Sequence, residues 1–418
     1  MPDRFTLRAR VLVPINRPPF EDGAVVVAAD RIEAVGRWQH IKRSFGGAVT
    51  DLGERILLPG LVNSHSHLDY THMAGLFPPQ KSFCDWIKLI TSEKPLWSTA
   101  DFAESWLEGA RTLVRNGTTT VADVESVPAL LPRVWDQVPL RVFSFLEMTG
   151  IRSRSAPGPI LAEVLDKIST LRHDRCKVGL APHAPYSTTK KLLKLTAAAA
   201  RRYKLHVMIH LAESAPEFDM FMHRRGEMFH WLRRNQRDMS DCGGVSPLRH
   251  VAATGLLSRR LLVVHANYLA RGDATLLANK GVSVVHCPRS HQYFGHCKFQ
   301  YEKLARAGVN ICLGTDSLAT VRAKPKERIE LNMFDEMRRF ADVHPEISPE
   351  TILRMATVNG ALALGMKGVL GELKRGAYAD MIALPFPSSL RRTYEAVIEH
   401  TGPVAASMIA GQWAVRPD

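Results

Sequence analysis

Short apolar runs alternate with amphipathic stretches through the central part of the chain. The runs are rich in β-branched residues and nearly continuous in hydrophobic character, which is typical of parallel strands covered on both faces. The stretches between them follow a helical period, as in 102–116, where Phe102 and Trp106 recur on one face. Gly117 is expected to end that helix. The pattern predicts strands at 56–67, 118–124, 140–148, 176–183, 205–213, 261–267, 282–288 and 310–317.

Eight strands that alternate with helices predict an α/β fold, a (β/α)8 barrel of the TIM type, better than an open doubly wound sheet. No G-x-G-x-x-G motif follows an early strand, which argues against a dinucleotide-binding fold. The two chain ends differ from the centre because they resemble short antiparallel strands joined by turns. We therefore expect residues 1–55 and 370–418 to form one small β-sandwich domain, and residues 56–369 to form the barrel.

The composition limits the classes of protein that this chain can belong to. With 418 residues, 45% of them hydrophobic and 23% charged, the chain is typical of globular proteins with a large core. The net charge of +14 comes from scattered Lys and Arg, so a solvated basic surface is expected and a nucleic-acid partner is not. No apolar run is long enough to cross a bilayer. The six cysteines form no C-x-x-C pair, which favours a reducing, cytoplasmic setting.

Polar side chains that can bind metal lie at the ends of seven of the eight predicted strands. His65 and His67 end the first strand, where residues i and i+2 point to the same face. The full set is His65, His67, Glu147, His183, His210, Glu213, His265, His286, Cys287 and Asp316. Catalytic groups of TIM barrels lie at the carboxyl ends of the strands, so these side chains are expected to meet on one rim. A single histidine at a strand end can be a structural residue. Metal-binding side chains at the ends of seven strands together predict a metal site.

Six short motifs carry a resemblance to a known family. They are PGLVNSHSHLD, APHAPYS, HLAES, VVHAN, VVHCPRS and GTDS, in that order along the chain. Their order and spacing resemble the amidohydrolase superfamily, in particular its mononuclear deaminase and chlorohydrolase branch. That branch holds deaminases of 5′-substituted adenosines, aminofutalosine deaminases and triazine hydrolases. The resemblance covers nearly the whole chain, including the terminal GELKRGAYADMIAL.

The resemblance implies one divalent metal ion, with Zn²⁺ preferred and Fe²⁺ as the alternative. The implied ligands are His65, His67, His210 and Asp316. Two-metal relatives use a carboxylated lysine at the end of a middle strand. Here the third and fourth strands end in Glu147 and His183, so one metal is expected, although Glu147 leaves a second metal open.

The resemblance also implies the roles of other residues. Water activated by the metal would attack an amidine carbon, and Glu213 would carry a proton to the ring nitrogen and then to the leaving amine. His265 and Asp316 would orient and deprotonate the water. The implied substrate-binding residues are His183, which would hold the ring, Glu93, which would bind ribose hydroxyls, and Glu147.

The expected function is deamination of an aminopurine, a 5′-substituted or modified adenosine. Amide hydrolysis or chloride displacement on the same fold remains the alternative. The loop 284–299 lacks the asparagines of many branch members and instead carries His291 and His296, which contact substrate or only shape the loop. The long segment 214–257 resembles a lid or a specificity element. A small-molecule substrate is expected, with no nucleic acid or membrane partner, and homodimers are common among the relatives.

Overall fold

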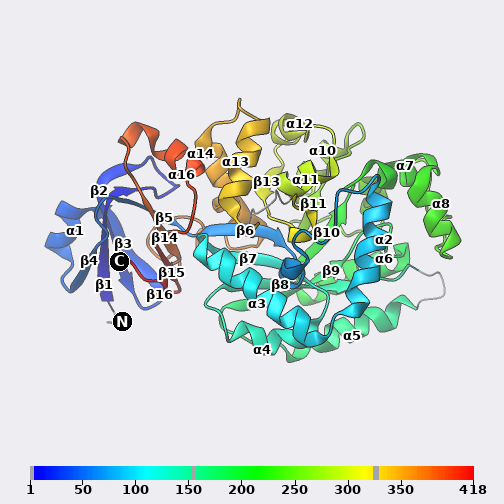
Figure 1. Cartoon of the computed structure of the whole chain (residues 1–418), viewed down its shortest axis with the longest axis horizontal. Helices are drawn as coiled ribbons and strands as arrows, with labels where there is room; N and C mark the ends of the chain where they lie inside the picture. Colours follow the sequence, from blue (N-terminus) through cyan, green and yellow to red (C-terminus); the bar gives the residue numbers. More distant parts are fainter. Residues whose placement is uncertain (1–3, 152–155, 323–328) are drawn as a thin grey trace.

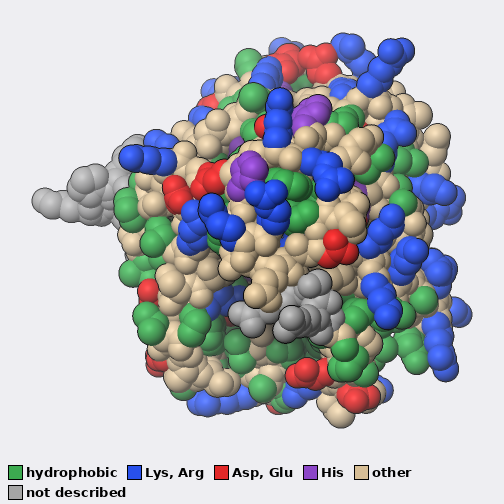
Figure 2. Space-filling model, turned by 90° about the vertical axis from the view of Figure 1, so that its right-hand side faces the viewer, with side chains coloured by type: hydrophobic (Ala, Val, Ile, Leu, Met, Phe, Trp, Pro, Cys, Tyr) green, Lys and Arg blue, Asp and Glu red, His purple; other side chains and the backbone are tan. Residues whose placement is uncertain are grey.

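The computed structural model describes residues 4–151, 156–322 and 329–418. A barrel occupies the right of Figure 1, and a smaller β domain that holds both chain termini lies at its left. Among the described residues, no helix combines the length and the apolar character that crossing a membrane requires. On the face in Figure 2, lysine and arginine side chains are scattered among acidic and apolar ones.

The barrel is one sheet of parallel strands in the order β13-β12-β11-β10-β9-β8-β7-β6. Its first and last strands close on each other, because Ser66 pairs with Asp316 and the Thr315 amide donates to the His65 carbonyl at 3.0 Å. This confirms the predicted TIM-type fold. The strands are β6 (Leu61–Ser66), β7 (Thr118–Glu125), β8 (Arg141–Met148), β9 (Cys176–Pro182), β10 (Val207–Leu211), β11 (Leu261–His265), β12 (Ser283–His286) and β13 (Asn310–Leu313).

Helices surround the barrel, and the longest of them shows why they form. Ser98 and Asp101 make a reciprocal capping box at its start, and Trp106 is fully buried against the sheet. The α-helices are α2 (Phe83–Glu93), α3 (Thr99–Arg115), α4 (Leu131–Trp135), α5 (Pro157–Thr170), α6 (Lys190–Tyr203), α7 (Ala215–His223), α8 (Gly226–Arg234), α9 (Pro247–Ala252), α10 (Asp273–Asn279), α11 (Pro288–Phe294), α12 (Tyr301–Arg306), α13 (Met333–Val343), α14 (Pro349–Met355), α15 (Val358–Ala363) and α16 (Thr393–Glu399). The 3₁₀ turns are η1 (Leu68–Met73), η2 (Lys94–Leu96), η3 (Pro128–Leu130), η4 (Leu318–Thr320) and η5 (Leu390–Arg392).

The small domain combines both chain ends in one mixed sheet, ordered β16-β15-β14-β5-β1-β2-β3, with β4 paired to β1. Leu7, Val25, Met381 and Met408 come from distant parts of this sheet and share one core, as in a β-sandwich. Its strands are β1 (Arg4–Leu12), β2 (Phe20–Ala28), β3 (Arg31–Arg37), β4 (Ala48–Asp51), β5 (Arg55–Pro59), β14 (Met381–Pro385), β15 (Ala406–Ile409) and β16 (Gln412–Val415), and helix α1 (Trp38–Ser44) packs beside them.

The predicted single strand at 56–67 is wrong, because the chain changes sheets at Gly60. Residues before Gly60 pair with β1 and β14, whereas residues after it enter the barrel beside β7. A Cβ atom at Gly60 would lie 2.1 Å from the Thr119 hydroxyl, so only glycine fits this close crossing. Both halves are buried, and the hydrophobic pattern therefore continues across the break. The wider division at 55/56 and 369/370 stays a prediction.

Candidate metal centre and active site

The carboxyl ends of β6, β10, β11 and β13 bring the predicted ligands together on one rim. The rings of His65 and His67 lie with centroids 4.9 Å apart. Asp316 follows β13 in a left-handed conformation with φ of 55°, and His265 ends β11 with φ of 75°. A positive φ strains the backbone of any residue other than glycine, and residues strained in this way concentrate at functional sites. This backbone conformation directs the side chains of His265 and Asp316 inward, which a straight strand would not do.

The four implied ligands converge on one point. His67 Nε2 lies 3.3 Å from His210 Nε2 and 3.7 Å from Asp316 Oδ1. His65 Nε2 lies 3.5 Å from the same carboxylate oxygen. All four side chains are buried, and the structure thus places three imidazoles and one carboxylate around a shared centre.

The protonation of these groups suits a cation. His210 Nδ1 lies 3.0 Å from the His183 carbonyl, so Nδ1 carries the proton and the Nε2 lone pair faces the centre. Burial, together with His65, lowers the pKa of His67 to about 3, which leaves a neutral ring. Burial opposes ionisation of Asp316, but the nearby imidazoles, His65 first among them, hold its pKa well below the ordinary value. His65 Nε2 is buried and has no hydrogen-bond partner among the described residues. This donor set fits a divalent metal.

Glu213 and His265 form a second pair beside the ligands. Glu213 Oε1 lies 3.5 Å from His265 Nε2, and both side chains are buried. Burial, with the charges of Asp316 and Glu217, raises the pKa of Glu213 well above its ordinary value. Burial lowers the pKa of His265 to about 3. Glu213 can therefore hold a proton near neutral pH, while His265 stays neutral, a suitable division for acid–base chemistry.

The turn that carries Glu213 is fixed through its backbone. The buried Glu217 carboxylate accepts the amide N–H groups of Ala212 at 3.0 Å and of Glu213 at 2.9 Å. From the segment just after β11, Asn267 Nδ2 donates to the Glu213 carbonyl at 2.9 Å. Neither Glu217 nor Asn267 was predicted from the sequence, although Asn267 lies within the VVHAN motif.

A cavity of about 480 Å³ opens next to these groups. Its polar side holds His67, His210, Glu213 and Asp316, and its other walls include aromatic side chains. Those aromatic residues are Tyr70, Trp86, Tyr186 and Trp231. Trp231 belongs to α8, so part of the predicted lid segment does line the cavity. Phe221, Met228 and Phe229 of the same segment belong to the apolar cluster against which Trp231 packs.

Two of the three predicted substrate-binding residues line this cavity, namely His183 and Glu147. Glu93 is placed elsewhere, where its Oε1 accepts the Trp97 indole N–H at 3.1 Å. Lys94, the next residue, lines the cavity instead and was missed, because a one-residue shift at the end of α2 decides which side chain faces inward.

Lys94 and Glu147 form an ion pair inside the cavity. Lys94 Nζ lies 3.5 Å from Glu147 Oε2, and His183 Nε2 lies 3.8 Å from Glu147 Oε1. Burial opposes ionisation of Glu147, but Lys94 lowers its pKa to about 2. In the described part of the chain, Glu147 belongs to no group with metal-binding geometry, so nothing there favours a second metal.

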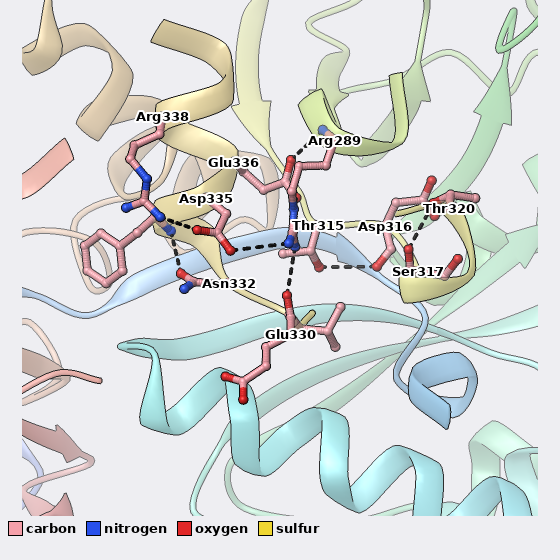
Figure 3. A network of polar contacts seen from close by, with 12 residues as sticks. Arg289, Thr315, Asp316, Ser317, Thr320, Glu330, Asn332, Asp335, Glu336 and Arg338 are labelled. Carbon is pink, nitrogen blue, oxygen red and sulfur yellow. Dashed lines mark hydrogen bonds and ion pairs between the residues drawn. The ribbon is translucent and has the colours of Figure 1, made fainter. Parts of the chain in front are cut away.

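The loop that carries Asp316 is held by hydroxyl groups, as Figure 3 shows. Thr315 Oγ1 lies 3.3 Å from the Asp316 carbonyl and 3.2 Å from Ser66 Oγ, and Thr320 donates to the Ser317 carbonyl at 2.9 Å. Farther out, Arg289 binds the buried Glu336 of α13 and donates to the Glu330 carbonyl. These contacts tie α11 and α13 to the rim.

Comparison with known proteins places the chain in a family. The model of the Amidohydrolase family matches residues 56–414, and the chain belongs to this family. The 5-methylthioadenosine/S-adenosylhomocysteine deaminase of Nitratidesulfovibrio vulgaris strain Hildenborough is 32% identical over 387 residues, covering 88% of this chain and 80% of that relative.

Two solved structures are similar throughout. An adenosine deaminase from Xanthomonas campestris with bound zinc has a TM-score of 0.84 and 25% identity, covering 98% of this chain and 92% of that one. An aminofutalosine deaminase from Helicobacter pylori in complex with methylthio-coformycin has a TM-score of 0.86 and 19% identity, covering 98% and 99%. The family confirms the predicted class of enzyme, a hydrolase of carbon–nitrogen bonds that works with a divalent metal.

Proposed function

We propose that the protein is a metal-dependent deaminase that releases ammonia from the adenine ring of a 5′-substituted or modified adenosine. The observation that carries the proposal is the buried Glu213–His265 pair, at 3.5 Å, beside the four-ligand centre in the same cavity. The names of two similar proteins support it, a 5-methylthioadenosine/S-adenosylhomocysteine deaminase and an adenosine deaminase.

We assign His65, His67, His210 and Asp316 as ligands of one Zn²⁺ ion. The chemistry that a divalent metal supplies at such residues is activation of water near neutral pH. His210→Ala removes a ring that orients toward the centre through the His183 carbonyl. We expect this variant to purify with little metal, as measured by elemental analysis. Full metal occupancy in the variant would contradict the ligand set.

The residues around the centre divide the proton transfers. His265 and Asp316 accept the proton of the attacking water. Protonated Glu213 donates to the ring nitrogen as water adds to the amino-bearing carbon. The resulting Glu213 carboxylate takes the proton of the added hydroxyl group and passes it to the amine as the carbon–nitrogen bond breaks, so that the carbonyl forms and ammonia leaves. The proton held by His265 and Asp316 then returns to Glu213. The raised pKa of Glu213 suits the first of its steps.

The cavity suits a nucleoside. We assign His183 to the ring and Glu147, kept ionised by Lys94, to hydroxyl groups of the sugar. Trp86 and Trp231 supply flat apolar surface, and Trp86 Nε1 is a buried donor with no partner in the part of the chain that the structure describes. A paired carboxylate and ammonium favour a hydroxylated substrate over a triazine, the alternative. Glu93 is left without a substrate role.

The test is ammonia release by the zinc-loaded protein from aminofutalosine, S-adenosylhomocysteine, 5′-methylthioadenosine, adenosine, guanine and an aminotriazine. We expect turnover of one of the adenine nucleosides, and its loss in Glu213→Gln. A metal-replete enzyme that is silent across the panel would overturn the proposal in favour of amide or chloride hydrolysis. A cytoplasmic location and a homodimer stay predictions.

A further inference from the structure

A second cavity, of about 230 Å³, lies beside the seventh barrel strand and shares no lining residue with the substrate cavity. It is formed by the end of β12, by α11 with the loop after it, and by the end of α13. Its nitrogen-bearing side chains are His286, His291, His296, His344, Lys298 and Arg339. No Asp or Glu lines it in the part of the chain that the structure describes.

Several of these nitrogens are buried and unsatisfied. His286 Nδ1, His296 Nε2, His344 Nε2 and Arg339 Nε have no hydrogen-bond partner among the described residues. Buried polar atoms in native proteins are nearly always paired, and a charged group left unpaired costs more than a neutral one. His344 Nδ1 faces the Glu346 carboxylate and carries the ring proton, so His344 Nε2 is an acceptor. The Arg339 Nε–H is a donor, and together with His286 Nδ1 and His296 Nε2 it indicates a missing polar partner at this cavity.

The charges select an anion over a cation. Arg339 has no acidic partner in the described ranges, and Lys298 stands at the rim of the same cavity. The carboxylate of Glu346, which does not line the cavity, lies 3.5 Å from Lys298 Nζ and 3.2 Å from His344 Nδ1, so it already pairs with these two side chains. Every group with metal-binding geometry in the described residues lies at the catalytic rim, and none lies here.

We propose that this cavity binds a small oxyanion of the phosphate type, either inorganic phosphate or the terminal phosphate of an ester. Its position agrees with the general tendency of TIM barrels to bind phosphate at the loops after strands 7 and 8. Burial lowers the pKa of His291 to about 4, and burial with the neighbouring His291 lowers that of His296 to about 3, so both rings are neutral and the positive charge at the cavity comes from Arg339 and Lys298.

The cavity is connected to the turn that carries Glu213 through His291 and Asn267. His291 Nδ1 lies 3.1 Å from Asn267 Oδ1, and Asn267 donates to the carbonyl of Glu213. A bound oxyanion would therefore lie two side chains away from the turn that carries the proton shuttle. This assigns His291 and His296, whose roles the sequence left open, to the second cavity and not to the substrate cavity.

The experiment is titration of the metal-loaded protein with inorganic phosphate by isothermal calorimetry. We expect saturable binding in the native protein and at least about tenfold weaker binding in Arg339→Met, which keeps the alkyl stem and loses the charge-assisted hydrogen bonds. Lys298→Met, at a side chain 59% exposed, provides a second variant that removes one charge at the rim with little risk to folding. The matched control is Arg306→Met, an exposed arginine paired with Glu302 outside the cavity.

Phosphate bound at the metal centre would not depend on Arg339 or Lys298. Equal affinity in the native protein and both variants, or no saturable binding at all, would overturn the site. A parallel titration with ribose 5-phosphate separates the two sources, since tighter binding of the ester identifies an organic phosphate and tighter binding of the free ion identifies inorganic phosphate. The readout is ligand binding, so its failure leaves the proposed deamination untouched.

Discussion

Burial shifts the pKa values of the ionisable residues at the rim, and Glu213 is the clearest case. Its carboxyl contacts His265, while its backbone and not its side chain is held by Glu217 and Asn267. Glu213→Gln should therefore preserve the turn and the metal content but lower kcat by about 10²–10⁴-fold, because an amide cannot carry the proton. Steady-state kinetics with elemental analysis checks this, and unchanged turnover would remove the shuttle role.

The Lys94–Glu147 pair makes a prediction about pH. In the native protein the pKa of Glu147 lies at about 2, because Lys94 outweighs burial, so the carboxylate is charged throughout the working range. In Lys94→Met only burial and the nearby imidazoles still act on Glu147. We therefore expect the pKa of Glu147 to rise. We expect KM for the nucleoside to increase more than kcat falls, and KM to worsen further as pH falls and Glu147 takes up a proton.

The control for this variant is Lys374→Met, which removes a lysine paired with Glu372 outside the cavity. It should leave the KM–pH profile unchanged. A profile for Lys94→Met that matches the native one would show that Glu147 does not depend on Lys94 for its charge.

At the scale of single elements, the turn after β10 connects the sheet to catalysis. Asn267, just after the neighbouring strand, holds this turn through the Glu213 carbonyl, but it contacts none of the four assigned ligands in the described contacts. We expect Asn267→Ala to reduce kcat by about tenfold or more, since small displacements of catalytic groups are costly, while metal content stays full. Loss of metal in parallel with activity would assign Asn267 a structural role instead.

The elements also show what hydrophobic patterning can and cannot resolve. The apolar runs located every barrel strand, because strands covered on both faces keep a nearly continuous hydrophobic character. The same continuity concealed the change of sheet at Gly60, where a buried strand of one domain passes directly into a buried strand of the other. It also extended four strands too far: β10 ends at Leu211, before Ala212 with φ of 51°, and β11, β12 and β13 end at His265, His286 and Leu313.

At the scale of the whole molecule, the metal ligands could be predicted because barrel topology brings all strand ends to one rim, whatever their distance along the chain. Residues that act through tertiary contact could not. Lys94 reaches Glu147 from a turn 53 positions earlier (147 − 94), and Arg289 reaches Glu336 from another helix. No sequence period marks such pairs, since each depends on how helices pack around the completed barrel.

The two domains are joined by a buried ion pair, which leads to a prediction about stability. Arg141, at the start of β8, donates to Asp380 at 3.1 and 3.2 Å, and the two side chains are only 5% and 3% exposed. Asp380 also accepts the Ala410 amide, and its backbone carbonyl accepts the Gly60 amide at the point where the chain changes sheets. Asp380→Ala leaves the buried guanidinium of Arg141 without its partner, and it should lower the free energy of unfolding by about 3–5 kcal/mol.

Urea denaturation followed by circular dichroism measures this cost, and Asp51→Ala is the matched control. Asp51 pairs with Arg8 at 2.9 Å at the surface, where such a pair contributes about 0–1 kcal/mol. The double variant Arg141→Met/Asp380→Ala should recover part of the loss, because it leaves no unpaired charge in the junction. If Asp380→Ala cost no more than Asp51→Ala, the junction would be held by apolar packing alone, and the ion pair would serve only to align β8 with the terminal strands.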